Sequence, residues 1–256
     1  MIHPSAIIHP SAILADDVSV GPFSIIGEEV KIGAGTEIGP HVVVDRWTEI
    51  GEGNQILQFA SIGAAPQDLK YNGEETHLKI GDRNRIREFV TLNRGTPGGG
   101  GVTQIGDDNL FMAYSHVAHD CHVGHQVILA NGATLAGHVE VEDSAILGGL
   151  AAVHQFCRIG CHTMISGGAM VTQDILPYTV AQGDRAKMMG LNLVGLKRRG
   201  FPTETIRGIK NAYRLLLRSG LRMEEALKQI ETELEQTPEL QHFVDSIKNS
   251  QRGIAR

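Results

Sequence analysis

The sequence predicts an all-β solenoid built from six-residue repeats, followed by an α-helical domain at the C-terminus. Aliphatic residues recur at every sixth position from Ile2 to Ile62, again from Ile80 to Leu92, and again from Ile105 to Val171, where Phe111 takes one of the positions. A period of six fits neither a helix nor an alternating strand, but it suits short strands separated by turns, with three strands in each coil. Beyond about residue 191 the apolar residues take the spacing of amphipathic helices. We therefore expect a solenoid domain over residues 1–190 and a helical domain over residues 191–256.

The remaining positions of the repeat indicate a narrow triangular prism. Four residues after many of the aliphatic positions stands a small residue, such as Ala12, Ser24 or Thr36. Directly after many of them stands a glycine, such as Gly21 or Gly51, and we expect these glycines to supply the positive φ that corners need. Hydrophobic residues make up 41% of the chain but aromatic residues only 5%, which is typical of a thin core filled by Ile, Val and Ala.

Two loops interrupt the solenoid. Residues 63–79 lose the aliphatic pattern but keep its register, and residues 95–104 shift the register by one position. Loops that project from a rigid scaffold are common carriers of function. Gln67, Asp68 and Lys70 are not needed for turn formation, so they are candidate ligand contacts. The glycine run of the second loop lacks a phosphate-binding motif, and we interpret it as a flexible excursion.

The helical domain should contain three helices. Thr203 is the expected N-cap of the first, which Gly220 ends; the second covers about residues 222–236, and Pro238 opens the third. We expect these helices to cover the last coil of the solenoid, whose strand edges would otherwise be unpaired.

Charge is unevenly distributed along the chain. The net charge is −6, yet residues 185–222 contain ten Lys or Arg residues against Glu204 alone, a local charge of +9, so that the rest of the chain carries −15. This asymmetry predicts an anionic partner for the basic segment. Nucleic acid is a poor candidate for that partner, because the repeats lack interleaved basic and aromatic residues.

The sequence also bears on compartment and on covalent chemistry. No stretch of about 18 apolar residues predicts a transmembrane segment, and the repeat already occupies the first 14 residues where a signal peptide would lie, so we expect a cytoplasmic protein. Cys121, Cys157 and Cys161 form no closely spaced pair, which argues for reduced thiols and against a zinc site of short ligand spacing.

Histidines are concentrated in the second half of the solenoid. Residues eighteen apart lie on adjacent coils, about 4.8 Å from each other, so His119, Gly137 and Gln155 should form one column, with Asp120 and His138 in the next. An imidazole beside a carboxylate and over an accessible glycine N–H provides the general base, the orienting group and the oxyanion donor of an acyl-transfer site. Seven of the twelve histidines belong to this region: His116, His119, His122, His125, His138, His154 and His162.

Two simpler interpretations of this cluster remain open. His122, His125 and His162 are best explained as solvated residues on outward positions. The whole cluster could instead bind a metal, as in the γ-class carbonic anhydrases, whose hexapeptide coils hold a metal with three histidines across a subunit interface. Their ligands include two histidines five positions apart, whereas the spacing here is three, and the register supplies no further carboxylate ligand.

Five motifs give the chain a close resemblance to a known family. They are QDLKY at 67–71, HVAHDC at 116–121, LAGHV at 135–139, VHQFC at 153–157 and GLKRRGF at 195–201. Together with the helical tail they resemble the acyl-[acyl-carrier-protein]–UDP-N-acetylglucosamine O-acyltransferases, which begin lipid A synthesis in Gram-negative bacteria. The resemblance implies a left-handed parallel β-helix of hexapeptide repeats and a homotrimer with active sites between subunits.

The resemblance also implies roles for individual residues. His119 would be the general base that deprotonates the 3-hydroxyl of the glucosamine unit, Asp120 its orienting partner, and Gly137 the oxyanion donor. No cofactor or metal is implied, and the donor would be an acyl thioester of acyl carrier protein, an acidic partner that suits the basic segment. The implied contacts to the sugar nucleotide are Gln67, Asp68, Lys70, His116, His138, His154, Gln155, Asn192, Arg198 and Arg199.

Three further positions concern specificity. In the family one side chain closes the acyl groove; its position here is Gly167, or Gly168 if the alignment shifts by one, and a glycine there predicts a long chain of about 12 to 14 carbons. Asn93 replaces a histidine found in many members, and Val194 replaces a glutamate. Because both lie in or near the expected acceptor region, a 3-amino analogue of the sugar remains an alternative acceptor to the 3-hydroxyl sugar.

Overall fold

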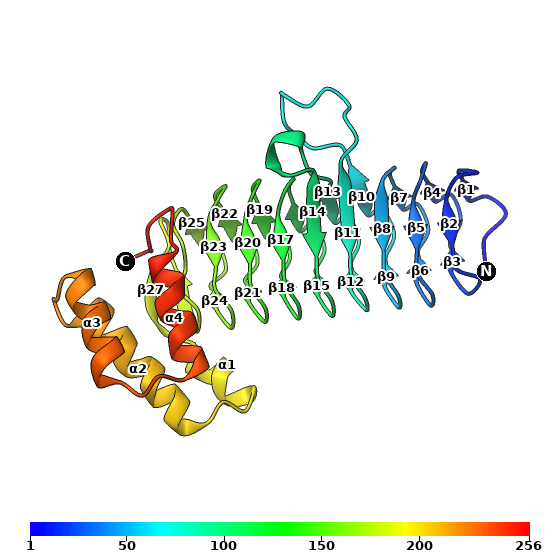
Figure 1. The fold of residues 1–256 in the computed structure, drawn as a ribbon. Helices are drawn as coiled ribbons and strands as arrows, with labels where there is room; N and C mark the ends of the chain where they lie inside the picture. Colours follow the sequence, from blue (N-terminus) through cyan, green and yellow to red (C-terminus); the bar gives the residue numbers. More distant parts are fainter.

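The protein, described here by a computed structural model of residues 1–256, is a three-sided prism of short strands with a cluster of helices at its C-terminal end (Figure 1). Each side of the prism is one sheet, and successive strands of the chain go to successive sheets. The strands are parallel, except that β27 returns antiparallel to β26. The predicted all-β solenoid with a C-terminal helical domain is therefore confirmed.

The first sheet contains nine strands: β1 (Ile7–Ile8), β4 (Ile25–Ile26), β7 (Val43–Val44), β10 (Ser61–Ala64), β13 (Thr91–Asn93), β16 (His116–Val117), β19 (Thr134–Leu135), β22 (Ala152–Val153) and β25 (Met170–Val171). The second contains eight: β2 (Ile13–Leu14), β5 (Lys31–Ile32), β8 (Thr48–Ile50), β11 (His77–Ile80), β14 (Val102–Ile105), β17 (His122–Val123), β20 (Glu140–Val141) and β23 (Arg158–Ile159). The third contains ten: β3 (Ser19–Val20), β6 (Glu37–Ile38), β9 (Gln55–Ile56), β12 (Arg85–Ile86), β15 (Leu110–Phe111), β18 (Ile128–Leu129), β21 (Ile146–Leu147), β24 (Met164–Ile165), β26 (Thr179–Gln182) and β27 (Lys187–Leu191).

The register of the sheets follows the six-residue period. In the first sheet Val117 pairs with Leu135, and Leu135 pairs with Val153, so equivalent residues of adjacent coils are eighteen apart. These second residues of the strands point inward and are fully buried, whereas the first residues point outward. The narrow core that results accounts for the scarcity of aromatic residues.

The role expected for the corner glycines is largely wrong. Gly21 and Gly51 do not have positive φ; a Cβ on Gly21 would instead lie 2.7 Å from the carbonyl carbon of Gly39 on the next coil. Glycine is needed at these positions because the backbones of adjacent coils approach closely. Positive φ occurs elsewhere in the turns, largely at residues with side chains, including Asp120 (φ 59°) and His138 (φ 61°).

Both interrupting loops leave the prism at the edge between the first and second sheets, where Figure 1 shows them projecting together. The second loop contains a short 3₁₀ helix, Pro97–Gly99. Buried Arg94 fastens the first loop: its guanidinium donates to the Gly63 carbonyl at 2.6 Å and to the Tyr71 hydroxyl at 3.1 Å, and it pairs with Asp45 at 3.1 Å. A buried cation with these partners holds the start and the middle of the loop on the scaffold.

Four helices, one more than expected, follow the last strand: α1 (Leu193–Arg198), α2 (Thr203–Arg218), α3 (Met223–Glu233) and α4 (Pro238–Lys248). Thr203 is the first helical residue rather than the N-cap; Pro202 precedes it and makes no side-chain cap. Pro238 does open its helix, behind a Thr237 side chain that accepts from the Leu240 N–H. No helix of the protein has the length and apolar character required to cross a membrane.

Candidate active site

The structure brings His119, Asp120 and Gly137 together at the edge between the first and second sheets. His119 Nδ1 lies 2.8 Å from Asp120 Oδ2, and its ring covers Gly137 so closely that a Cβ there would lie 2.5 Å from the ring. The side chain of Asp120 is 1% exposed and that of His119 is 15% exposed. Since an ionised carboxylate only accepts, Nδ1 carries the proton, and Nε2 keeps a lone pair that can take another.

Asp120 is held by the glycine-rich loop. Thr96 donates to both carboxylate oxygens, from its backbone N–H to Oδ1 at 2.8 Å and from its hydroxyl to Oδ2 at 2.6 Å. The Asp120 N–H in turn donates to the Thr103 hydroxyl at 2.8 Å, and a Cβ on Gly99 would collide with the carboxylate. The segment interpreted as a flexible excursion is therefore a fitted cover over the carboxylate, and its glycine permits the close approach.

His138 completes this group. Its Nε2 lies 3.7 Å from Asp120 Oδ2, its ring meets that of His119 edge-on, and it stacks on Phe156 with ring centroids 4.4 Å apart. Burial lowers the pKa of His138, and although Asp120 and Asp68 oppose that shift they do not reverse it. A cavity of about 250 Å³ opens beside these residues, lined in part by Gly99, Asp120, His138 and Phe156.

The other predicted histidines lie on the same side of the molecule. His116, one turn before His119, is half-buried, and its Nδ1 lies 2.7 Å from the Thr91 hydroxyl. Burial, followed by the proximity of His119, lowers the pKa of His116. His154 and Gln155 are exposed two coils beyond the coil of His116. There Arg252 from the C-terminal tail contacts His154 Nδ1 at 3.1 Å.

The QDLKY loop leaves from the same edge. Asp68 is half-buried and accepts from the Lys70 N–H at 2.9 Å, so the expectation that it takes no part in turn formation is wrong. Its charge acts on His138, which places it beside the cluster. The side chains of Gln67 and Lys70 are exposed and bind no other group of the chain. These three positions can thus reach a ligand held near His138.

Asn192, Arg198 and Arg199 lie at a different edge. Asn192 caps α1 through Gly195 and donates to the His162 carbonyl at 2.9 Å. Arg199 donates to Gln126 at 2.9 Å, at the edge between the second and third sheets, and Arg198 is exposed beside it. One chain therefore does not bring its own Arg198 and Arg199 to its own His119.

Gly167 lies at the remaining edge, between the third and first sheets. A Cβ there would meet the Gly149 carbonyl oxygen at 3.2 Å and otherwise face open space, and its φ is not in the left-handed region. Gly168 has φ +69°, yet the equivalent Leu150 one coil earlier has φ 60° with a full side chain. A side chain at Gly167 therefore requires the Gly149 carbonyl to shift by a few tenths of an ångström, and one at Gly168 has to adopt the left-handed φ that Leu150 adopts.

Comparison with known proteins decides the family. A family model described as UDP N-acetylglucosamine O-acyltransferase, domain 2, matches residues 174–255, and the bacterial transferase hexapeptide model matches residues 11–46 and 103–137. The acyl-[acyl-carrier-protein]–UDP-N-acetylglucosamine O-acyltransferase of Alkalilimnicola ehrlichii is 58% identical over 100% of this chain and 99% of its own. The chain belongs to this O-acyltransferase family.

Solved structures of the O-acyltransferase family agree over the whole chain. The enzyme from Moraxella catarrhalis is 47% identical with a TM-score of 0.97. The match covers 100% of this chain and 99% of that chain. The Arabidopsis enzyme is 39% identical with a TM-score of 0.87, covering 100% of both chains. The left-handed parallel β-helix implied by the sequence motifs is confirmed, and the carbonic anhydrase interpretation is not favoured.

The two departures from the O-acyltransferase pattern have different surroundings. Asn93 is buried, and its amide nitrogen lies 3.3 Å from the Ala64 carbonyl oxygen and 3.2 Å from that of Ala65, so it tethers the QDLKY loop. Val194 is 62% exposed on α1, at the edge that carries Arg199. The named relatives act on UDP-N-acetylglucosamine by their names, which does not favour the amino-sugar alternative.

Sequence reasoning missed two residues that shape the site, Arg94 and Thr96. Both belong to the short segment LNRGT, directly before the glycine run, where the only signal was a shift in register. The sequence does not show that Arg94 is buried, because arginines are mostly exposed in folded proteins. A threonine after a glycine is too common to single out. Their contacts depend on which segments the coils place side by side.

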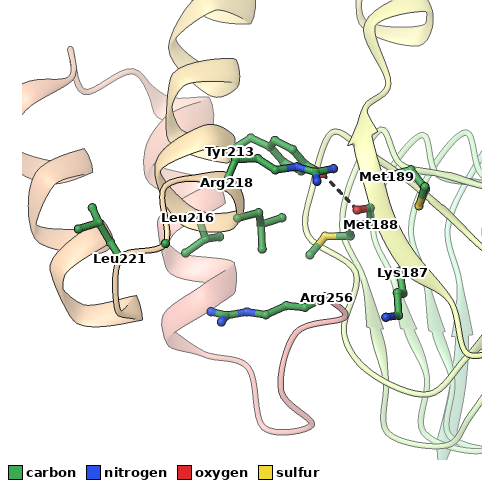
Figure 2. Close-up of a pocket in the computed structure, with 10 residues that line it drawn as sticks. Lys187, Met188, Met189, Tyr213, Leu216, Arg218, Leu221 and Arg256 are labelled. Carbon is green, nitrogen blue, oxygen red and sulfur yellow. Dashed lines mark hydrogen bonds between the residues drawn. The ribbon is translucent and has the colours of Figure 1, made fainter.

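A second cavity lies far along the chain from this cluster, where α2 meets β27 (Figure 2). Its volume is about 430 Å³. Apolar side chains of Met188, Leu216 and Leu221 line it, and Tyr213 donates to the Met188 carbonyl at 3.2 Å. Arg218 from the basic segment also lines it, so this cavity belongs to the positively charged end of the molecule.

Proposed function

We propose that this chain transfers an (R)-3-hydroxyacyl group from acyl carrier protein to the 3-hydroxyl of UDP-N-acetylglucosamine, the first step of lipid A synthesis. Family membership supports the reaction class. The observation that carries the mechanism is the His119 ring, fixed through Nδ1 by buried Asp120 and packed against Gly137 where a Cβ would lie. The Gly137 N–H donates to no other group of the chain and is available as an oxyanion donor.

The proposed reaction proceeds without a covalent enzyme intermediate. His119 Nε2 removes the proton of the sugar hydroxyl as its oxygen attacks the thioester carbonyl. The tetrahedral oxyanion accepts from the Gly137 N–H, and Asp120 stabilises the imidazolium. Collapse breaks the carbon–sulfur bond, and the imidazolium returns its proton to the departing thiolate. General-base catalysis contributes about 10²- to 10⁴-fold, and one oxyanion donor about 2.7–4 kcal/mol.

Substrate contacts belong to the same proposal. Asp68, His116 and His138 would position the sugar at the His119 edge, with Gln67, Lys70, His154 and Gln155 at its exposed rim. Asn192, Arg198 and Arg199 would bind the nucleotide and its phosphates, since guanidinium groups suit phosphate oxygens. Lys70→Ala should weaken substrate binding more than it slows the chemical step, because a flexible loop cation positions rather than transfers protons.

A homotrimer would bring these residues into one site. His119, Arg199 and Gly167 occupy three different edges of one prism. A site that needs all three requires that edges from neighbouring copies meet, and cyclic association of three prisms can bring unlike edges together. We place the active sites between subunits for this reason, with Gly167 closing the acyl groove.

The carrier protein would dock on the basic segment, residues 185–222, with its charge of +9. Arg214 and Arg218 on α2 form no ion pair within the chain, and Arg218 lines the cavity of Figure 2. An acidic partner would be steered to this surface. A cytoplasmic location is part of the proposal, because it brings the chain together with nucleotide sugar and acyl carrier protein.

One assay tests the function. Purified protein is offered 3-hydroxyacyl carrier protein, acetyl-CoA or carbon dioxide, in the presence of chelator, with the hydroxy sugar nucleotide or its 3-amino analogue as acceptor. We expect O-acylated UDP-N-acetylglucosamine from the first donor alone. Failure to form it, with activity on another donor, would refute the proposed reaction, and preference for the amino sugar would correct the acceptor.

A further inference from the structure

A second group of metal-ligating side chains lies at the edge between the second and third sheets, and the proposed reaction uses none of them. It consists of Glu142, Cys161 and His242, whose ligand atoms all lie within 4.8 Å of one another. Glu142 and Cys161 come from adjacent coils, whereas His242 is on α4 in the helical domain. Two separate parts of the fold thus converge on one point.

The Glu142 carboxylate organises this group. Its Oε2 accepts from the Cys161 backbone N–H at 2.8 Å and lies 2.7 Å from His242 Nε2, although Glu142 and His242 are 100 residues apart in the chain. The side chains of Glu142 and His242 are 26% and 41% exposed, and Cys161 is partly buried. The donors are therefore held in place yet reachable from solvent.

We propose that Glu142, Cys161 and His242 form a zinc site that fastens the helical domain to the last coils of the prism. A thiolate, an imidazole and a carboxylate are each ordinary zinc ligands, at about 2.3 Å for sulfur and about 2.0–2.2 Å for nitrogen and oxygen. Tetrahedral bonds of these lengths separate the donor atoms by about 3.3–3.8 Å. The group needs side-chain adjustments of only about 1 Å to reach that geometry, and water completes the fourth position.

Binding of zinc to this group releases two protons. Zinc takes the places of the Cys161 thiol proton and the proton on His242 Nε2, both of which pass to solvent, and Glu142 exchanges the hydrogen bond from His242 for a metal bond. The site differs from the closely spaced cysteine pairs that a sequence reveals, because each ligand comes from a different turn or helix. For that reason the spacing of the cysteines alone argued against zinc.

Cobalt substitution tests the site directly. Chelator-treated protein is titrated with Co²⁺ and followed by absorption spectroscopy, since a cobalt–thiolate bond produces a near-ultraviolet charge-transfer band that histidine and carboxylate ligands do not. We expect one equivalent of cobalt per chain with this band, displacement by Zn²⁺, and a higher thermal midpoint with zinc than without it. The His119, Asp120 and His138 group, which also lies within ligating distance, contains no thiol and cannot give the band.

Three variants complete the test. Cys161→Ser should abolish the band, and Cys157→Ser, which removes a buried thiol outside the group, should leave it unchanged. His242→Gln can keep a hydrogen bond to Glu142 but has no imidazole, so we expect at least tenfold weaker cobalt binding with an unaltered circular dichroism spectrum. Absence of the band in the parent protein, or its survival in Cys161→Ser, would show that these residues form only a hydrogen-bonded ion pair.

Discussion

Replacing Thr96 with valine removes one hydroxyl group, which besides its bond to Asp120 also accepts from the Gly99 N–H at 3.2 Å. That hydroxyl donates to Asp120 Oδ2 at 2.6 Å, while the Thr96 N–H, which the variant keeps, still donates to Oδ1 at 2.8 Å. Because Asp120 is 1% exposed, water cannot easily replace the lost donor. A hydrogen bond to a buried charge contributes about 1.5–3 kcal/mol, so we expect the free energy of unfolding to fall by about that amount.

The effect on catalysis should be of similar size. Without the hydroxyl the carboxylate keeps only the Thr96 N–H and His119 as close donors, so the position of Asp120 is less fixed when the imidazolium forms. A 1.4 kcal/mol loss is a tenfold change, so we expect kcat to fall by about 10- to 100-fold, with KM for the nucleotide sugar changed less than about twofold. The assay is steady-state acylation of UDP-N-acetylglucosamine, together with urea unfolding of the same preparations.

Thr96→Ser is the matched control, because serine retains the hydroxyl and loses only a methyl group. It should recover most of kcat. If Thr96→Val kept more than half of the parent turnover, or if the serine variant were as impaired as the valine variant, then Thr96 would not position Asp120 and the glycine-rich loop would have only a structural role.

Three further outcomes are expected. His119→Ala should lower turnover by about 100- to 10,000-fold while leaving the fold intact, because the ring lies outside the hydrophobic core; more than a tenth of parent activity would exclude the general-base role. Gly167→Met should shift donor preference to shorter acyl chains, since each buried methylene is worth about 0.8 kcal/mol, and unchanged selectivity in a competition between donor lengths would remove the residue from the groove. Charge reversal at Arg214 and Arg218 should raise KM for acyl carrier protein and flatten its salt dependence; if neither changes, the carrier docks elsewhere.

The sequence alone determined the solenoid, because each coil repeats the same short-range pattern. An inward aliphatic residue every six positions requires three strands per coil, and a spacing of eighteen residues then fixes which side chains become neighbours. That arithmetic places His119 over Gly137 and Asp120 beside His138. It does so because each coil of a solenoid adds the same number of residues, so that neighbours on adjacent coils follow from counting along the chain.

Handedness was not contained in that arithmetic, since left- and right-handed coils have the same period; it came from the five motifs and their relatives. The glycine prediction failed for a related reason. Periodicity locates a corner, but whether a glycine there serves φ or close approach depends on the next coil, whose backbone lies 2.7 Å from the missing Cβ of Gly21.

Only the tertiary structure decided the contacts that cross the register. Arg94 binds the Gly63 carbonyl and Thr96 binds the Asp120 carboxylate, and neither pair is separated by the eighteen residues that relate adjacent coils. His242 contacts Glu142 from 100 residues away because α4 packs back against the prism. The separation of His119, Arg199 and Gly167 onto three edges is likewise a property of the closed prism. Such contacts depend on where loops and helices pack, which long-range burial determines and a six-residue repeat does not encode.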